Sequence, residues 1–202
     1  MENFLTISRI LEIAGFVLGL LYLWWEYHVD RRMWIAGLLM PAISMFVYFS
    51  KGLYADFAMN IYYLAMGVYG FTAWGRRSAA DKKKKGLPVS SMNLRQTLLC
   101  VAAFVPVYVF LALWLIYGTD SNVPYADAFT TAGSIIGTWM LARKYLQQWF
   151  VWIAVDVVCT ALYIYKGIYF YSFLYAAYTV VAVFGYLKWK RVMNAESAMK
   201  NN

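Results

Sequence analysis

The chain has 202 residues, of which 63% are hydrophobic, 20% aromatic and only 14% charged. Soluble domains carry about 25% charged residues and about 45–50% apolar ones, so this composition excludes a soluble globular protein. The formal net charge of +8 would favour nucleic-acid binding in a soluble chain; here membrane topology accounts for it, and no nucleic-acid partner is expected. Cys100 and Cys159 lie in separate apolar runs, which predicts neither a disulfide framework nor a metal site.

Seven apolar segments approach the length of about 20 residues that a helix needs to cross a membrane. The first is not a secretory signal, because Arg9 and Glu12 lie near its start and further spans follow it. The sequence therefore predicts an all-α integral membrane protein with seven transmembrane helices. They cover residues 7–25, 33–49, 55–74, 97–117, 125–142, 148–165 and 170–187.

Lysine and arginine residues gather on one side of the predicted bundle. Only Arg9, Lys51 and Lys166 lie on the side of the N-terminus, and the other fifteen of the 18 lie in the alternate segments. Because basic residues are enriched in cytoplasmic loops, the N-terminus is predicted outside and the C-terminus in the cytoplasm. The basic run at 82–85 is then a topology-setting loop, and binding of anionic lipid is the alternative interpretation.

An internal repeat emerges when the chain is aligned with itself at an offset of 115 residues. Spans one and five are separated by an even number of crossings, so the two halves run in parallel, as in SWEET transporters. The strongest match aligns Lys51-Gly-Leu-Tyr54 with Lys166-Gly-Ile-Tyr169. Other identities pair Trp34 with Trp149, Tyr63 with Tyr178, Gly70 with Gly185, and Trp74 with Trp189.

This repeat predicts a 3+1+3 organisation within a single transmembrane domain at 1–202. Transporters of this design bind substrate between their halves near the membrane midplane, which favours transport on architecture alone. The predicted parts are a first three-helix repeat at 1–74, a basic cytoplasmic linker at 75–96, a connector helix at 97–117, a second three-helix repeat at 118–189 and a cytoplasmic tail at 190–202.

The sixth span carries the main candidate site. Trp149, Trp152, Asp156, Thr160 and Tyr163 are spaced by three, four, four and three residues, which places them on one helical face. A central aspartate costs about 2.5–3.5 kcal/mol on insertion scales, so such groups usually face the bundle interior and mark a pathway or site. Tryptophans with one carboxylate suit a flat cationic ligand. The alternative is an aspartate hydrogen-bonded to neighbouring helices for packing.

Two other spans offer polar candidates at helical spacing. Asn60 and Tyr63 in span three, and Tyr175 and Tyr178 in span seven, could bind a polar ligand or could form a helix-packing seam. Pro41 breaks span two at the position that the repeat aligns with Asp156. It is a candidate gating kink, with an ordinary proline bend as the alternative.

Trp24, Trp25, Trp74 and Trp189 fall near span ends, where interfacial aromatic belts are expected. Arg9 and Glu12 are three residues apart and are expected to pair on one helix face.

The sequence offers no enzyme chemistry. The single histidine, His28, lies in a loop, which leaves no metal cluster and no histidine-based catalytic set. A phosphate-binding loop motif is also absent from the sequence. We therefore expect neither cofactor nor metal.

Several motifs resemble the PnuC family of bacterial vitamin transporters. They are Gln148-Trp-Phe-Val-Trp-Ile-Ala-Val-Asp156, Leu162-Tyr-Ile-Tyr-Lys-Gly-Ile-Tyr169, Lys51-Gly-Leu-Tyr-Ala-Asp56, Tyr69-Gly-Phe-Thr-Ala-Trp74 and Arg143-Lys-Tyr-Leu-Gln-Gln-Trp149. The resemblance implies a SWEET-like protomer, commonly a homotrimer among the lipids of the bacterial inner membrane. It also implies facilitated diffusion of an unphosphorylated vitamin, which a separate cytoplasmic kinase or pyrophosphokinase then traps.

The resemblance implies nicotinamide riboside as the substrate of most members, and thiamine or riboflavin in related branches. Trp149, Trp152 and the adjacent Gln148 match the family motif as substrate-binding positions. The chain departs from the nicotinamide riboside pattern at Asp156, where that pattern has asparagine, and at Asn60, where it has glutamine. Nicotinamide riboside and thiamine are both flat cations; the family favours the first, and these departures favour the second.

Three other functions stay open at this point. A central aspartate could relay protons, which would make uptake proton-coupled. A membrane receptor or non-transporting subunit would have the same composition. An intramembrane enzyme is disfavoured, because Asp156 has no convergent nucleophile, base or metal ligands in the sequence.

Overall fold

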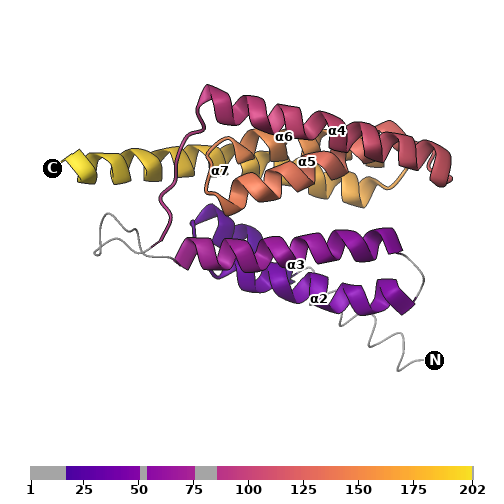
Figure 1. Cartoon of the computed structure of the whole chain (residues 1–202), viewed down its shortest axis with the longest axis horizontal. Helices are drawn as coiled ribbons and strands as arrows, with labels where there is room; N and C mark the ends of the chain where they lie inside the picture. Colours follow the sequence, from indigo (N-terminus) through magenta and orange to yellow (C-terminus); the bar gives the residue numbers. More distant parts are fainter. Residues whose placement is uncertain (1–16, 51–53, 76–85, 202) are drawn as a thin grey trace. The chain divides into compact units, whose positions relative to one another are not determined.

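The computed structural model describes residues 17–50, 54–75 and 86–201 (Figure 1). Within these residues the backbone forms seven helical segments, which confirms the predicted all-α class. A helix at 17–27 is followed by α2 (Met33–Ser50), α3 (Tyr54–Gly75), α4 (Leu94–Gly118), α5 (Pro124–Ala142), α6 (Gln148–Tyr165) and α7 (Tyr169–Asn201).

Three of the described helices are long and apolar enough to cross a membrane. They span Leu94–Gly118, Gln148–Tyr165 and Tyr169–Met199, and a shorter apolar stretch covers Met33–Met45. Many of their apolar side chains, including Leu98, Phe110 and Phe184, are exposed. Exposed apolar surface of this extent is expected for helices that face hydrocarbon rather than water.

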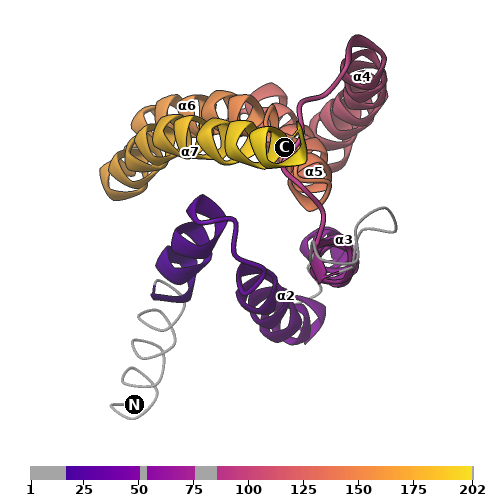
Figure 2. The same cartoon turned by 90° about the vertical axis from the view of Figure 1, so that its left-hand side faces the viewer.

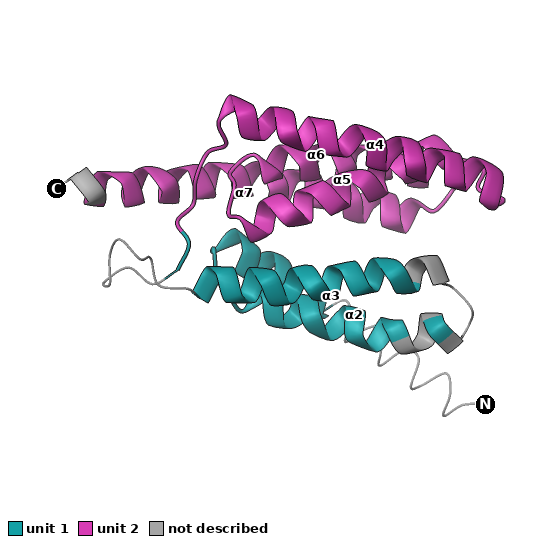
Figure 3. Cartoon of the chain, in the orientation of Figure 1, with its two compact units in different colours: residues 1–87 teal, residues 88–202 magenta. Residues whose placement is uncertain are grey.

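The chain forms two compact units, Met1–Leu87 and Pro88–Asn202 (Figure 3). In the first unit α2 packs against α3; in the second, α4 packs on α5, α5 on α6 and α6 on α7. Figure 2 shows α6 and α7 side by side within the second unit. The boundary between the units falls inside the predicted linker at 75–96, and the predicted connector helix packs with the second unit.

Two helices differ from the sequence predictions. Helix α7 continues to Asn201, although its span was predicted to end at Leu187. The added turns contain lysine, arginine, alanine and methionine without glycine or proline, and such residues favour a helix in water as well as in lipid. Helix α2 runs continuously from Met33 to Ser50 with Pro41 inside it, so the prediction that Pro41 breaks the span is wrong.

A tryptophan–glycine–tryptophan contact occurs once in each unit. In the second unit Trp149 and Trp189 meet edge to face at 5.6 Å, and Gly185 lies directly under the Trp149 ring. In the first unit Trp34 and Trp74 meet edge to face at 5.8 Å, with Gly70 in the same place. These positions are the ones that the 115-residue register pairs.

The same contacts correct one expectation. Trp74 and Trp189 are 4% and 0% exposed, so they do not belong to an interfacial belt. Each lies at a span end but turns inward, because a glycine on the same helix leaves room for the partner indole. Trp24 is 62% exposed, and its place in an interfacial belt stays a prediction.

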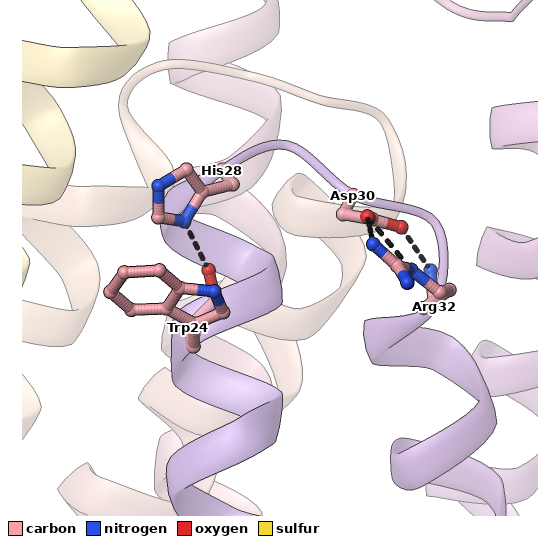
Figure 4. Close-up of polar contacts among 4 residues, drawn as sticks. All are labelled: Trp24, His28, Asp30 and Arg32. Atoms are coloured by element: carbon pink, nitrogen blue, oxygen red, sulfur yellow. Dashed lines mark hydrogen bonds and ion pairs between the residues drawn. The ribbon is translucent and has the colours of Figure 1, made fainter.

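Local hydrogen bonds shape the turn between the helix at 17–27 and α2. Figure 4 shows His28 Nδ1 donating to the Trp24 carbonyl oxygen at 2.8 Å, and Arg32 pairing with Asp30 at 2.7 Å. The hydrogen-bonded Arg32 guanidinium holds the pKa of the Asp30 carboxyl below its usual value. Arg31 donates from Nε to the Phe71 carbonyl oxygen at 2.7 Å, which ties this turn to the end of α3.

A strap, residues 88–92, precedes α4 and binds to the loop between α5 and α6. The Ser90 N–H donates to the Lys144 carbonyl oxygen at 3.1 Å, and the Leu146 N–H donates to the Ser90 carbonyl oxygen at 2.9 Å. Gln147 accepts from the Met92 N–H at 2.9 Å. Backbone and side chain therefore fix the start of α4 to the second unit.

Lys144, whose backbone carbonyl oxygen accepts the hydrogen bond from the strap, is buried and is expected to make stability depend on pH. Burial lowers the pKa of its amine to about 8, while the Glu196 carboxylate acts in the opposite direction. An unfolded lysine titrates near 10.4, so between these values the unfolded chain binds more protons and stability rises with pH. Below about pH 8 the buried amine is charged, and its burial lowers the free energy of unfolding by an amount of order 3 kcal/mol, since each unit of pKa difference corresponds to about 1.36 kcal/mol.

We therefore expect Lys144→Met to raise the melting temperature of the detergent-purified protein at pH 7. The gain should shrink as pH rises through 8 and vanish near pH 10. Lys190→Met, at an exposed position, is the matched control. A difference between wild type and Lys144→Met that stays constant from pH 7 to 10 would contradict this assignment.

Candidate functional site

Trp152 and Asp156 are one turn apart on α6 and turn toward the neighbouring helices of the second unit. The Trp152 ring lies over Gly137 of α5, where an added Cβ would be 3.4 Å from the indole atoms Cε2 and Cζ2. Its Nε1 is buried and, among the described residues, has no hydrogen-bond partner. A buried N–H without a protein acceptor is available to a ligand.

The Asp156 carboxylate lies between α6 and α7. The residue is 7% exposed, and it interacts electrostatically with Tyr175 and Tyr178 of α7. Within the described part of the chain no donor or cation is paired with its side chain. Buried carboxylates are normally paired, so this one is suited to receive a positively charged or hydrogen-bonding ligand.

Aromatic rings continue this face away from Asp156. Tyr163 stacks on Tyr175 at 5.3 Å and on Tyr171 at 5.4 Å, and Tyr175 meets Tyr178 edge to face at 5.7 Å. Ring pairs of this geometry add about 0.5–1.5 kcal/mol each beyond their buried area. The stack thus holds the α6 and α7 tyrosines in defined positions.

The Thr160 hydroxyl is used within the helix. It donates to the Asp156 carbonyl oxygen at 2.8 Å, and the Ser172 hydroxyl donates to the Thr160 carbonyl oxygen at 3.2 Å. Ser172 was not among the sequence predictions, because a single serine in an apolar run carries no signal of its partner.

Gln148 and Trp149 are 0% and 2% exposed. The Trp149 ring is enclosed by Gly185 and Trp189, so in this structure it packs α6 against α7. A ligand can touch either residue only after the surrounding side chains move.

In the first unit, Asn60 and Tyr63 lie on α3 and are partly buried. Tyr63 interacts electrostatically with Tyr22 of the helix at 17–27, a residue that sequence reasoning missed. The Tyr22 ring in turn packs on Gly37 of α2, where an added Cβ would be 3.3 Å from its Cε2. Pro41 is buried one turn further along α2.

Some sequence predictions lie outside the described residues, namely those on Arg9, Glu12, Lys51 and the basic run at 82–85. At the position paired with Glu12, Asp127 forms an ion pair with Lys166 at 3.7 Å. In the described ranges, no group of three histidine, cysteine or acidic residues could hold a metal ion.

Comparison with a solved structure identifies the fold. The chain superposes on the crystal structure of the vitamin B3 transporter PnuC with a TM-score of 0.68, covering 96% of this chain and 89% of that one at 22% sequence identity.

Comparison with curated sequences and families identifies the relatives. The nicotinamide riboside transporter PnuC of Escherichia coli is 24% identical over 89% of this chain and 84% of its own length. The riboflavin/roseoflavin transporter RibM of Streptomyces davaonensis is 27% identical over 88% of this chain and 83% of its own length. Residues 9–191 match the family described as nicotinamide mononucleotide transporter. The chain therefore belongs to this family of membrane vitamin transporters, and it is not an enzyme.

Proposed function

We propose that the protein takes up a small, cationic, unphosphorylated vitamin by facilitated diffusion, with nicotinamide riboside as the substrate. The observation that carries a cationic substrate is the buried Asp156 carboxylate, one turn from Trp152, for which the described residues provide no paired donor or cation. The choice of nicotinamide riboside among cationic vitamins is supported by the curated nicotinamide riboside transporter that the chain resembles. A carboxylate in a low-dielectric site attracts a cation strongly and repels a phosphate. An aromatic face next to it attracts a cationic ring. Thiamine, also a flat cation, is the alternative substrate for the same site.

The candidate residues divide by their place in the structure. Trp152 and Asp156 contact the ring, and Tyr175 and Tyr178 bind the polar appendage. Asn60 and Tyr63 are proposed as polar contacts from the first unit. Further substrate-binding residues on α6 are proposed to be Gln148, Trp149, Thr160 and Tyr163. Pro41, within continuous α2, is proposed to act in gating.

The proposed architecture is two parallel three-helix repeats with α4 as the connector. The repeats rock to give alternating access, with the N-terminus outside and the C-terminus in the cytoplasm of the bacterial inner membrane. A homotrimer is the proposed assembly. A cytoplasmic kinase or pyrophosphokinase then traps the vitamin, so passive flux becomes net uptake.

Calorimetric titration of the purified protein tests the substrate directly. Nicotinamide riboside, thiamine, riboflavin and nicotinamide mononucleotide are titrated in parallel. We expect binding of nicotinamide riboside and at least about tenfold weaker binding of the mononucleotide, because one unfavourable charge contact costs 1.4 kcal/mol or more. Tighter binding of thiamine would establish the alternative, and binding of neutral riboflavin alone would overturn the role given to Asp156.

Flux into sealed proteoliposomes separates a carrier from a receptor or subunit. We expect the bound vitamin to equilibrate across the membrane and to exchange with unlabelled vitamin. Uptake should not respond to an imposed pH gradient. Binding without flux would favour a receptor, and accumulation driven by the gradient would establish proton coupling through Asp156.

A further inference from the structure

A polar residue with an aromatic residue one turn deeper occurs in both units, but on different helices. In the second unit, α6 carries buried Gln148 beside the preceding loop and Trp152 four residues further on. In the first unit, the helix at 17–27 carries buried Glu26 beside the following loop and Tyr22 four residues before it. Each pair thus has its polar side chain at the loop end.

These two helices do not correspond to each other in the 115-residue register. The helix at 17–27 corresponds to α5, and α2 corresponds to α6. Tyr22 corresponds to Gly137, and Gly37 corresponds to Trp152. In the second unit the α6 ring lies on a glycine of the preceding helix; in the first unit the ring of the preceding helix lies on a glycine of α2. Cβ atoms added at the two glycines would be 3.4 and 3.3 Å from the rings. Each unit therefore has an aromatic ring packed on a glycine of the neighbouring helix. The ring comes from α6 in the second unit, but from the helix before α2 in the first.

The neighbours of the two rings support this equivalence. Tyr22 interacts electrostatically with Glu26 on its own helix and with Tyr63 on α3. Asp156, one turn from Trp152, interacts with Tyr178 on α7. Because the register pairs Tyr63 with Tyr178, the last helix of each unit, α3 in the first and α7 in the second, presents a corresponding tyrosine to this polar and aromatic face.

We propose that Tyr22 contacts the transported vitamin and helps to set its selectivity, as the first unit's counterpart of Trp152. The inference rests on the proposed function. The Tyr22 ring offers a stacking face. Its hydroxyl can both donate and accept a hydrogen bond, whereas the indole of Trp152 can only donate. Tyr22 is therefore suited to a substrate that combines a flat ring with a hydroxyl-bearing appendage.

Binding measurements on the full chain test the proposal. We expect Tyr22→Leu to weaken the binding of nicotinamide riboside at least about tenfold, since it removes an aromatic contact. Tyr22→Phe should keep the ring contact but lower the preference for nicotinamide riboside over thiamine, which has fewer hydroxyls. Trp24→Leu is the matched control, because this aromatic residue on the same helix is 62% exposed.

The outcomes separate the inference from the proposed function. If wild type binds none of the vitamins, both fail. If wild type binds but Tyr22→Leu and Tyr22→Phe keep its affinity and selectivity, only the role of Tyr22 is overturned. A purely structural role would lower the melting temperature of Tyr22→Leu without changing the affinity of the folded protein.

The exchange of helices has its own test that needs no ligand. Tyr22→Gly leaves a cavity, and Gly37→Trp forces an indole into the space of Tyr22, so each should lower the melting temperature. The double variant recreates the arrangement of Trp152 and Gly137, and we expect it to melt above both single variants. A double variant that melts below both would overturn the equivalence of Tyr22 and Trp152.

Discussion

Asp156→Asn introduces the residue of the nicotinamide riboside pattern, but in this chain it is still expected to weaken binding of a cationic vitamin by at least about 30-fold, because losing one partner of a buried charged pair costs about 2–5 kcal/mol. Asparagine keeps the size and the acceptor oxygen of the side chain but removes its charge. The residue is 7% exposed and has no cation or donor among the described residues. We therefore expect the cationic ligand to be the partner of this carboxylate.

The same substitution should not destabilise the protein. A charged aspartate at the centre of a membrane helix costs about 2.5–3.5 kcal/mol on insertion scales, and its neutral amide avoids most of this cost. We expect an unchanged or higher melting temperature in the absence of ligand, with the loss confined to titration and flux. Wild-type affinity in a folded Asp156→Asn protein would remove Asp156 from the site.

Gly185→Ala is expected to give a large loss of stability for a single added methyl group. Its Cβ would lie 2.5 Å from the Trp149 ring, which is 2% exposed and enclosed by Trp189. Overpacking of this kind costs about 1–3 kcal/mol and occasionally more. For a chain of about 200 residues, roughly 3 kcal/mol lowers the melting temperature by about 6–12 °C.

The first unit contains an equivalent glycine, Gly70, and an uncrowded glycine, Gly19, that serves as a control. Gly70→Ala places a Cβ against Trp34 in the same way and should cost a similar amount. At Gly19 nothing lies within 4 Å of an added Cβ, so Gly19→Ala should stabilise by about 0.5–1 kcal/mol. Equal melting temperatures for the Gly19 and Gly185 variants would disprove the close contact.

Much of the fold could be predicted from hydropathy, and the limits of that approach are physical. The observed bounds of α6 match the predicted span at 148–165, because its apolar run and its helix end together. Helix α7 outlasts its apolar run, since helix propensity does not depend on hydrophobicity. Trp74 and Trp189 were misplaced because position along a span does not reveal which way a ring faces.

The candidate site could be predicted in part. Asp156 and Trp152 stand out on α6 because a central acid is costly and therefore informative. Tyr22 does not stand out in a chain with 18 tyrosines, and its partner Gly37 gives no chemical signal. The 115-residue register does pair Tyr22 with Gly137 and Gly37 with Trp152. Because the paired residues differ, this correspondence does not appear as an identity in the alignment.

The strap has a consequence for how the protein is made. Its acceptor, Gln147, follows Met92 by 55 residues, which at about 5–20 residues per second are synthesised roughly 3–11 s later. During that interval α4 and then α5 are synthesised while the strap is still unbound. The strap can therefore form these hydrogen bonds only after both helices of the α4–α5 hairpin and the following loop have been synthesised.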